Sequence, residues 1–332
     1  MNEISTSITW KPAEEITCNV APSTHWTTTM DKGDMNVTTT EEKKKTIGVY
    51  WSNRSEEGLL RPVIEELKKI EEFNVVENKI PDTPMGVAEY VLQLEKSDMP
   101  LPDYAVCAYD RPPVTLMAYF LYHVHVPIIQ FHAGDISTGT FDDMDRWCIT
   151  LWADYHFCAG KTQANRVRKF LRAMGRDPAH ISVSGVTNLD DLDKIAEPPD
   201  GDYDIVLYNP PTKATTEAMN NELTQLINTL DKETYWLVPN GDPGSVLIEG
   251  KVKDLAKVKN ISWTANMPHE ALLGLLSRAK RVIGNSSALY FEAPYFGCQI
   301  IQIGERNKCR ENVVLESGGS KRIARKLKEW LV

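Results

Sequence analysis

We expect an α/β protein with two parallel-sheet domains, because apolar strands and amphipathic helices alternate along two stretches separated by one break. Continuous apolar strands between such helices are typical of parallel sheets that are covered on both faces. A chain of 332 residues is also longer than one hydrophobic core usually serves. These observations predict two Rossmann-like domains, at residues 45–197 and 198–320, that face each other across a cleft.

The first domain should begin after residues 1–44, which are polar and threonine-rich, lack periodicity and read as an irregular extension. The apolar run 46–51 predicts a buried strand, and leucines and isoleucines at helical spacing predict a helix at 59–70. Only one short strand and one helix fit between residues 74 and 104. The further elements expected are strands at 104–108, 127–131, 155–159 and 181–184, and helices at 113–122 and 142–152.

The second domain should follow residues 196–202, whose prolines and glycine interrupt the pattern and predict a linker. The alternation then resumes with strands at 204–208, 235–239, 260–263, 281–284 and 299–303, and helices at 213–230, 245–256, 269–279 and 288–297. The last residues, 321–332, are expected to form a separate basic amphipathic helix.

The composition and charge of the chain argue against nucleic-acid binding, membrane insertion and disulfide or metal sites. A net charge of -9 disfavours nucleic acid as a partner, although a nucleic-acid base is not excluded as an acceptor. The basic run at 161–172 is interpreted as a solvated helix face. We find no apolar run long enough to span a membrane and no apolar signal core, so we expect a cytoplasmic protein. Six cysteines without a C-x-x-C pair indicate reduced thiols, and we expect neither a metal nor a cofactor.

The segment Gly284–Ser287, with sequence GNSS, lies between an expected strand and an expected helix. Ligands of open parallel sheets bind beyond the carboxyl ends of strands, where helix starts attract phosphate. The hydroxyls of Ser286 and Ser287, with nearby backbone N–H groups, therefore indicate a diphosphate-binding loop. Glu292, about a turn and a half into the expected helix, could accept hydrogen bonds from both hydroxyls of a ribose. A plain serine cap with a surface glutamate is the alternative.

This segment and its surroundings resemble the hydrolysing UDP-N-acetylglucosamine 2-epimerases. The resemblance rests on GNSS at 284–287, EAP at 292–294 and IGER at 303–306, together with Gly297 and Arg310. Three motifs of the family occur upstream in the family's order, namely RSEEGLLRP at 54–62, DR at 110–111 and NGDPGS at 240–245. The resemblance extends from about residue 45 to residue 310, so it includes both expected domains.

The resemblance implies the glycosyltransferase-B-type double Rossmann fold, with UDP bound by Ser286, Ser287 and Glu292 and approached by Arg54. In the family's reaction, a carboxylate removes the proton at C2 of a UDP-sugar and UDP leaves from C1. Water then adds to the unsaturated sugar with inversion at C2. Further substrate contacts are implied for Asn209, Asn240, Asp242, Arg306 and Arg310.

The sequence departs from the family at two positions. His132 stands where the family has an acidic catalytic residue, and Asn209 replaces a histidine. Asparagine cannot exchange a proton near neutral pH, whereas histidine can. Either His132 with Asp135 or Asp143 has taken over proton transfer, or C2 epimerisation is lost and only cleavage or transfer of the UDP-sugar remains. The catalytic candidates are Asp110, His132, Asp142 and Asp143.

Three functions remain open at this point. The main prediction is an enzyme of the UDP-N-acetylglucosamine 2-epimerase type that releases UDP from a UDP-sugar. The first alternative is a diverged glycosyltransferase that moves the sugar to an acceptor, and the second is a UDP-sugar-binding protein without turnover. By resemblance we also expect a homodimer.

Overall fold

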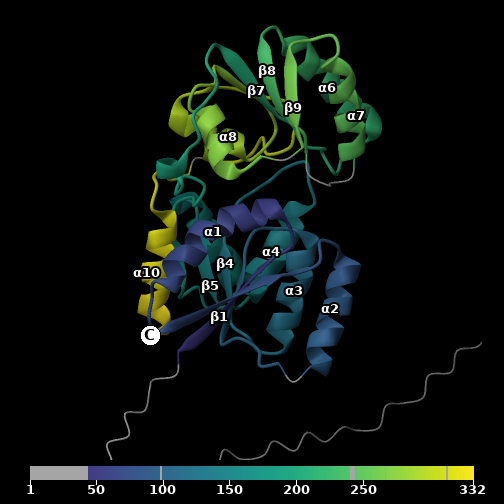
Figure 1. Cartoon of the computed structure of the whole chain (residues 1–332). Helices are drawn as coiled ribbons and strands as arrows, with labels where there is room; N and C mark the ends of the chain where they lie inside the picture. Colours follow the sequence, from purple (N-terminus) through teal and green to yellow (C-terminus); the bar gives the residue numbers. More distant parts are fainter. Residues whose placement is uncertain (1–43, 98, 240–243, 266, 312) are drawn as a thin grey trace, which may run out of the picture. The chain divides into compact units, whose positions relative to one another are not determined.

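The computed structural model describes residues 44–332 except 98, 240–243, 266 and 312, and it describes no side chain at 54 and 55. Two all-parallel sheets organise this part of the chain (Figure 1). The first has six strands in the order β2-β1-β3-β4-β5-β6, and the second has five in the order β11-β10-β7-β8-β9. The predicted pair of parallel-sheet domains is therefore confirmed. The expected extension at 1–44 lies outside the described residues, apart from Lys44.

The first sheet follows the predicted alternation closely. The stretch between residues 74 and 104 holds one strand and one helix, as expected. The elements of this half are β1 (Lys45–Trp51), α1 (Arg54–Lys68), β2 (Phe73–Lys79), α2 (Pro84–Lys96), β3 (Tyr104–Cys107), α3 (Pro112–His123), β4 (Ile128–Phe131), α4 (Asp142–Trp152), β5 (Tyr155–Cys158), α5 (Lys161–Ala173), β6 (Ile181–Val183) and the 3-10 turn η1 (Leu192–Lys194).

The second sheet also keeps the predicted order of strands and helices. Its elements are β7 (Tyr203–Leu207), α6 (Thr216–Thr229), β8 (Glu233–Leu237), α7 (Ser245–Leu255), β9 (Ile261–Thr264), α8 (His269–Leu276), β10 (Arg281–Gly284), α9 (Ala288–Phe291), the 3-10 turn η2 (Ala293–Phe296), β11 (Gln299–Gln302) and α10 (Gly319–Leu331).

Helix α1 begins five residues before the predicted start at residue 59, because a polar cap precedes its apolar face. The side chain of Asn53 accepts a hydrogen bond from the N–H of Glu56, and the carboxylate of Glu56 accepts one from the N–H of Asn53. This reciprocal capping satisfies N–H groups that a helix start otherwise leaves unpaired. Apolar periodicity alone could not reveal the first turn, which is polar.

The C-terminal helix α10 packs against the first sheet. Ile323, Ala324 and Leu327 are buried in the same hydrophobic cluster as strand β1 and helix α1. Asp190 accepts hydrogen bonds from the N–H groups of residues 318, 319 and 320, so a carboxylate from the first half caps the start of α10. The helix that the sequence sets apart at 321–332 thus completes the core of the first half.

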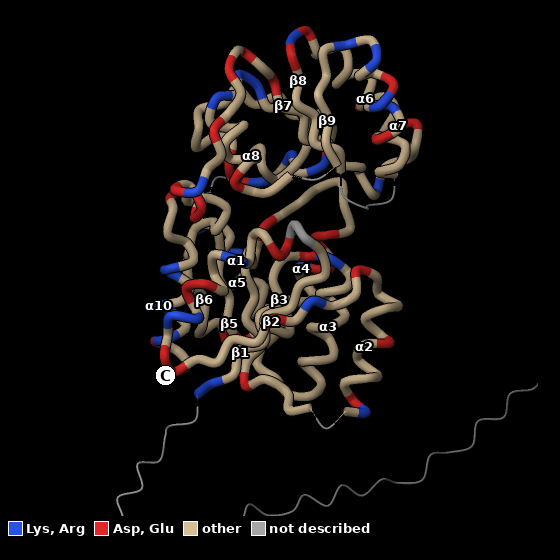
Figure 2. Tube along the Cα trace, viewed as in Figure 1, with Lys and Arg blue, Asp and Glu red and all other residues tan. Residues whose placement is uncertain are grey.

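Figure 2 shows Lys and Arg residues and Asp and Glu residues dispersed over both halves. On helix α5, Lys161, Lys169 and Arg172 are exposed, as expected for a solvated face, whereas Arg166 is half-buried and pairs with Glu311. Among the described residues, no helix is long and apolar enough to cross a membrane. The described cysteines are free, and Cys18 lies outside the described part.

The helix expected at 288–297 is broken in two. Helix α9 has only four residues, Glu292 is its C-cap, and the 3-10 turn η2 follows. Pro294 explains the break, because proline has no N–H to donate and its ring clashes with the preceding helical turn. Glu292 therefore lies at the end of a short helix and not inside a longer one.

In each sheet the chain adds strands first toward one edge and then toward the other, so there is one reversal point per sheet. In the first sheet it lies between β1 and β3, and in the second between β7 and β10. Loops that follow such strand pairs are the usual ligand-binding positions of doubly wound sheets. The loops after β3 and β4 and those after β7 and β10 carry most of the candidate residues.

We predict that Gly284→Ala lowers the free energy of unfolding by about 1–3 kcal/mol. Gly284 has a φ of +145°, and a Cβ atom there would lie 2.1 Å from the carbonyl oxygen of Leu207. Urea denaturation of both variants measures the difference. Gly250→Ala is the control, because nothing lies within 4 Å of the added Cβ atom in helix α7, so it should leave stability unchanged or raise it. Equal stabilities of the two variants would contradict the prediction.

Candidate active site

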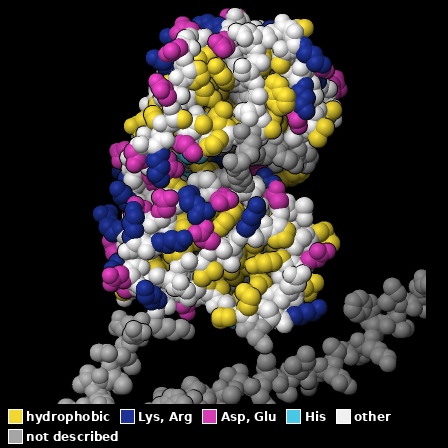
Figure 3. All heavy atoms as spheres, viewed as in Figure 1, with side chains coloured by type: hydrophobic (Ala, Val, Ile, Leu, Met, Phe, Trp, Pro, Cys, Tyr) yellow, Lys and Arg dark blue, Asp and Glu magenta, His cyan; other side chains and the backbone are white. Residues whose placement is uncertain are grey.

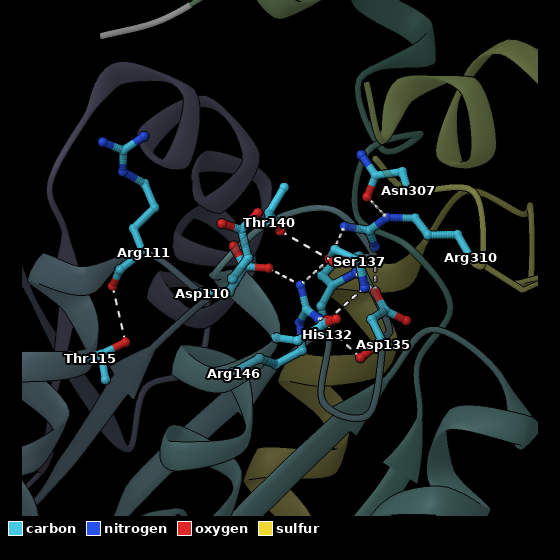
Figure 4. Close-up of polar contacts among 12 residues, drawn as sticks. Asp110, Arg111, Thr115, His132, Asp135, Ser137, Thr140, Arg146, Asn307 and Arg310 are labelled. Atoms are coloured by element: carbon cyan, nitrogen blue, oxygen red, sulfur yellow. Dashed lines mark hydrogen bonds and ion pairs between the residues drawn. The ribbon is translucent and has the colours of Figure 1, made fainter. Parts of the chain in front are cut away.

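A cluster of carboxylates surrounds the buried guanidinium of Arg146, which helix α4 directs toward the loops after β3 and β4 (Figure 4). Arg146 donates to Oδ1 of Asp143 at 2.7 Å, to the carbonyl of Asp135 at 3.0 Å and to the hydroxyl of Ser137 at 2.6 Å, and it also pairs with Asp110. A buried charge is tolerated only when it is paired and hydrogen-bonded. Arg146 therefore holds the carboxylates of this cluster in place through its hydrogen bonds and ion pairs.

The local sequence explains why these side chains meet. Asp142 and Asp143 occupy the first turn of α4, where the N-terminal end of the helix favours negative charge. The N–H of Ser137 donates to Oδ1 of Asp143 at 2.5 Å, so the loop after β4 closes onto that turn. Arg146, one turn further along α4, then reaches Asp110 in the loop after β3. The structure thus brings together the predicted candidates Asp110, Asp142 and Asp143.

Asp135 contacts two of the predicted site residues, His132 and Arg310. From the sequence it is expected only as a possible partner of His132. Its Oδ2 lies 3.3 Å from Nδ1 of His132 and accepts from Arg310 at 3.1 Å. Burial opposes ionisation of Asp135. The hydrogen bond from His132 and the charges of Arg310 and Arg146 outweigh that effect and hold the pKa of Asp135 below its usual range. Asp135 is therefore kept ionised.

His132 lies in the left-handed backbone region with a φ of +54°, which is unusual for a residue other than glycine. Its ring contacts Tyr109 and Phe291, with centroids 5.5 and 5.2 Å away. Tyr109, at the end of β3, also has a positive φ of 72°. Such strained positions persist where surrounding contacts over-determine them, and they concentrate at functional sites. The sequence shows no signal of this strain.

Asp142 differs from Asp135 in its electrostatic environment. Burial and then the negative charge of Asp110 raise the pKa of Asp142 to about 6. The guanidinium of Arg306 lies 3.7 Å from Asp142, and its positive charge opposes this rise of the pKa without cancelling it. One cluster therefore contains a carboxyl group that stays ionised and another that retains a proton near pH 6.

In the second half, Asn285 holds the loops after β7 and β10 together. Its side chain accepts from the N–H of Asn209 at 2.7 Å and donates to the carbonyl of Asn209 at 2.9 Å. Asn307 adds a hydrogen bond to the carbonyl of Asn285 at 2.7 Å and accepts from Arg310 at 2.6 Å. The predicted residues Asn209 and Arg310 thus belong to one hydrogen-bonded set at the reversal point of the second sheet.

The GNSS loop offers fewer free N–H groups than its sequence suggests. The N–H groups of Asn285 and Ser286 both donate to the carbonyl of Leu207. The hydroxyl of Ser286 accepts from the N–H of Ala288 at 3.3 Å. A four-residue helix also has only a small dipole. A phosphate at this loop would therefore depend mainly on the serine hydroxyls and on nearby arginines.

Glu292 is buried, with 4% of its surface exposed, and does not lie on the surface. Its Oε1 accepts from Asn188 at 2.8 Å and lies 3.6 Å from Nε2 of His269. Oε2 of Glu292 has no hydrogen-bonding partner within the described part of the chain. A buried acceptor without a donor is unfavourable, so this oxygen is suited to a ligand hydroxyl.

The remaining predicted residues are placed as follows. Arg306 donates to the carbonyl of Pro210 at 2.7 Å, next to Asn209. Asn240 and Asp242 lie outside the described residues, as does the side chain of Arg54. A half-open apolar cavity of about 200 Å³ between strands β8 and β9 and helix α8 contains none of the candidate residues.

Comparison with known proteins agrees with this architecture. The sequence model of the family described as UDP-N-acetylglucosamine 2-epimerase matches residues 85–331. A UDP-N,N'-diacetylbacillosamine 2-epimerase (hydrolyzing) of Legionella pneumophila is 24% identical over 63% of this chain and 58% of its own length. A UDP-N-acetylglucosamine 2-epimerase of Neisseria meningitidis is 29% identical over 55% of this chain and 50% of its own length. The matched segment thus spans 58% and 50% of the lengths of these two relatives.

A solved structure supports the fold independently. The crystal structure of a UDP-N-acetylglucosamine 2-epimerase homologue from Listeria monocytogenes superimposes with a TM-score of 0.68 at 15% identity, covering 87% of this chain and 97% of that one. Such low identity shows the fold alone. Because the family model matches well over half of the residues, the chain belongs to the UDP-N-acetylglucosamine 2-epimerase family.

Proposed function

We propose that the protein is a hydrolysing UDP-sugar 2-epimerase, which converts a UDP-linked 2-acetamido sugar and water into UDP and the free sugar inverted at C2. The observation that carries the proposal is the contrast between Asp135 and Asp142 in one arginine-held cluster. The pKa of Asp135 is lowered and that of Asp142 is raised to about 6. Carboxyl groups whose pKa values are pushed apart are suited to act as base and acid.

In this proposal Asp135 is the base. Its carboxylate removes the proton at C2, the C1–oxygen bond breaks, and UDP leaves with the bonding electrons as a double bond forms between C1 and C2. His132 and Arg310, both in contact with Oδ2 of Asp135, orient the carboxylate and keep it ionised. The ring of Phe291, which faces the Arg310 guanidinium at 4.7 Å, restricts how that arginine moves.

Asp142 is the acid in the second step. It donates a proton to C2 while the oxygen of water bonds to C1 and the water releases its second proton to the solvent. Asp142 then regains a proton from the solvent, and Asp135 gives up to the solvent the proton that it took from C2. Inversion requires that this proton arrive on the sugar face opposite to the one from which the first was removed. The charges of Asp110 and Arg146 act on Asp142 in opposite directions. After burial, the negative charge of Asp110 is the next largest cause that raises the pKa of Asp142, and the charge of Arg146 lowers it.

The nucleotide is proposed to lie along the second half. The hydroxyls of Ser286 and Ser287, with Arg306 and Arg310, would contact the diphosphate, for which a guanidinium offers several fixed donors. Glu292 would accept from the ribose through its free Oε2. The names of both relatives specify UDP-linked N-acetylated sugars, which supports this substrate class.

We further propose a homodimer. Hydrophobic side chains gather over helices α2 and α3 in Figure 3. On these two helices Met85, Leu92, Tyr119 and Tyr122 are 73, 52, 46 and 41% exposed. Apolar surface of this kind is typical of an interface, and most soluble oligomers are symmetric dimers. Sedimentation equilibrium of the full chain at micromolar concentration tests this, and a monomer there would contradict it.

The function is tested by incubating the full chain with several UDP-linked 2-acetamido sugars and measuring nucleotide and sugar products by mass spectrometry. The proposal expects UDP and a free sugar in equal amounts, at the same rate in buffer alone and with candidate acceptors. UDP release that requires an acceptor would identify a glycosyltransferase and contradict hydrolysis. Binding of UDP with no turnover of any substrate would contradict an enzymatic function.

A further inference from the structure

Three polar side chains from distant parts of the sequence meet away from the carboxylate cluster. Asn188 follows strand β6, His269 is the first residue of helix α8, and Glu292 caps the end of α9. Asn188 and Glu292 are almost fully buried, with 3 and 4% of their surfaces exposed. Nδ2 of Asn188 donates to Oε1 of Glu292 at 2.8 Å, so the two halves of the chain meet in this contact.

The hydrogen bonds of this cluster are incomplete. Oε2 of Glu292, Oδ1 of Asn188 and both ring nitrogens of His269 are buried, and none of them has a hydrogen-bonding partner in the described residues. The amide orientation follows from chemistry, because a flipped amide would place an oxygen against the carboxylate. Two buried acceptors therefore belong to one hydrogen-bonded pair and lack donors. Two adjacent hydroxyl groups supply two donors, which is the pattern that a ribose diol presents.

His269 stabilises the negative charge of this pair. Its Nε2 lies 3.6 Å from Oε1 of Glu292, an ion-pair distance, and its side chain is 15% exposed. Burial works against protonation of His269, but Glu292, Asp191 and Glu270 together outweigh it and raise the pKa of the imidazole. The amide of Asn188 donates to Oε1 and the ring of His269 lies beside the same oxygen, so Oε2 is the oxygen available to a ligand.

We propose that Asn188 and His269 are specificity-determining residues for the nucleotide, which complete with Glu292 a buried acceptor set that selects a ribonucleotide over a 2′-deoxyribonucleotide. Asn188 supplies the second acceptor through Oδ1, and His269 acts through Glu292 by orienting its carboxylate. This inference rests on the proposed function, since it assumes that the ligand is a uridine nucleotide. Neither residue was among the candidates from the sequence, because neither stands in a motif.

The test is titration calorimetry of the full chain with UDP and with 2′-deoxy-UDP. We expect wild type to bind UDP about tenfold more tightly, as loss of a hydrogen bond to a charged acceptor predicts. Asn188→Leu and His269→Leu should raise the Kd for UDP about tenfold and leave that for 2′-deoxy-UDP within about threefold. The discrimination between the nucleotides should therefore nearly disappear. Glu217→Gln, at an exposed position in the first turn of helix α6, is the control and should keep it.

The outcomes separate this inference from the proposed function. If wild type binds UDP but does not discriminate against 2′-deoxy-UDP, or if both leucine variants discriminate normally, the inference is wrong and the proposed function stands. If wild type binds neither nucleotide, the proposed function fails and the inference with it. Should Asn188→Leu not fold, as judged by circular dichroism, His269→Leu and His269→Gln decide the question. Gln at 269 retains a donor without the charge and should restore part of the discrimination.

Discussion

Asp135→Asn is expected to lower kcat for release of UDP about a thousandfold, in the range that loss of a general base produces. Asparagine keeps the size of the side chain and can still accept from Arg310, but it cannot remove a proton. The Kd for UDP should remain within about threefold of wild type, because Asp135 is proposed to act on the sugar and not on the nucleotide. Single-turnover kinetics with a UDP-sugar, together with calorimetry for UDP, measures both quantities.

Asp145→Asn is the matched control for this substitution. Asp145 also lies in the first turn of α4 and interacts electrostatically with Arg146, but it contacts Thr115 and lies outside the set around Asp135. Its variant should keep kcat within a few fold of wild type. Comparable losses in both variants would indicate a general effect on α4 and contradict the role of Asp135 as base.

The second large effect concerns Asp142 and pH. Because the pKa of Asp142 is about 6 in the folded protein, this residue is protonated below pH 6 and loses its proton as the pH rises. An acid is useful only while it holds its proton, so kcat should fall about tenfold for each pH unit above the pKa.

Asp142→Asn should lower kcat at pH 6 about a hundredfold and remove the descending part of the profile above that pH. Asparagine cannot donate the proton, so the residual rate no longer depends on this titration. Initial rates of UDP release between pH 5 and 9, in buffers of constant ionic strength, provide the test. A variant that retains both the rate and the descending limb would show that another group is the acid.

The overall fold was predictable from the sequence because its signals are local. Apolar runs identify buried strands, and recurring leucines identify helices, so helix α4 and strand β10 have the predicted bounds. The order of strands in each sheet, with the reversals between β1 and β3 and between β7 and β10, depends on pairing between distant segments. Likewise, nothing in the sequence of helix α10 reveals that it packs on the first sheet.

The site was predictable only in part. Asp110, Asp142 and Asp143 were candidates because they stand in motifs, and the structure brings them together around Arg146. The importance of Asp135 depends on its contact with Arg310, which is 175 positions away along the chain. Asn188 and His269 are recognisable only through the buried oxygens that they leave unpaired around Glu292. Such features arise from tertiary packing and have no local pattern.

The most direct test of the account is to run the reaction in deuterium oxide with a UDP-linked 2-acetamido sugar and to analyse the free sugar by NMR. Removal of the C2 proton by Asp135 and delivery of another by Asp142 predict one deuterium at C2 of the inverted product. A released sugar that keeps its original proton and configuration at C2, while UDP forms, would mean simple cleavage and would contradict the central claim.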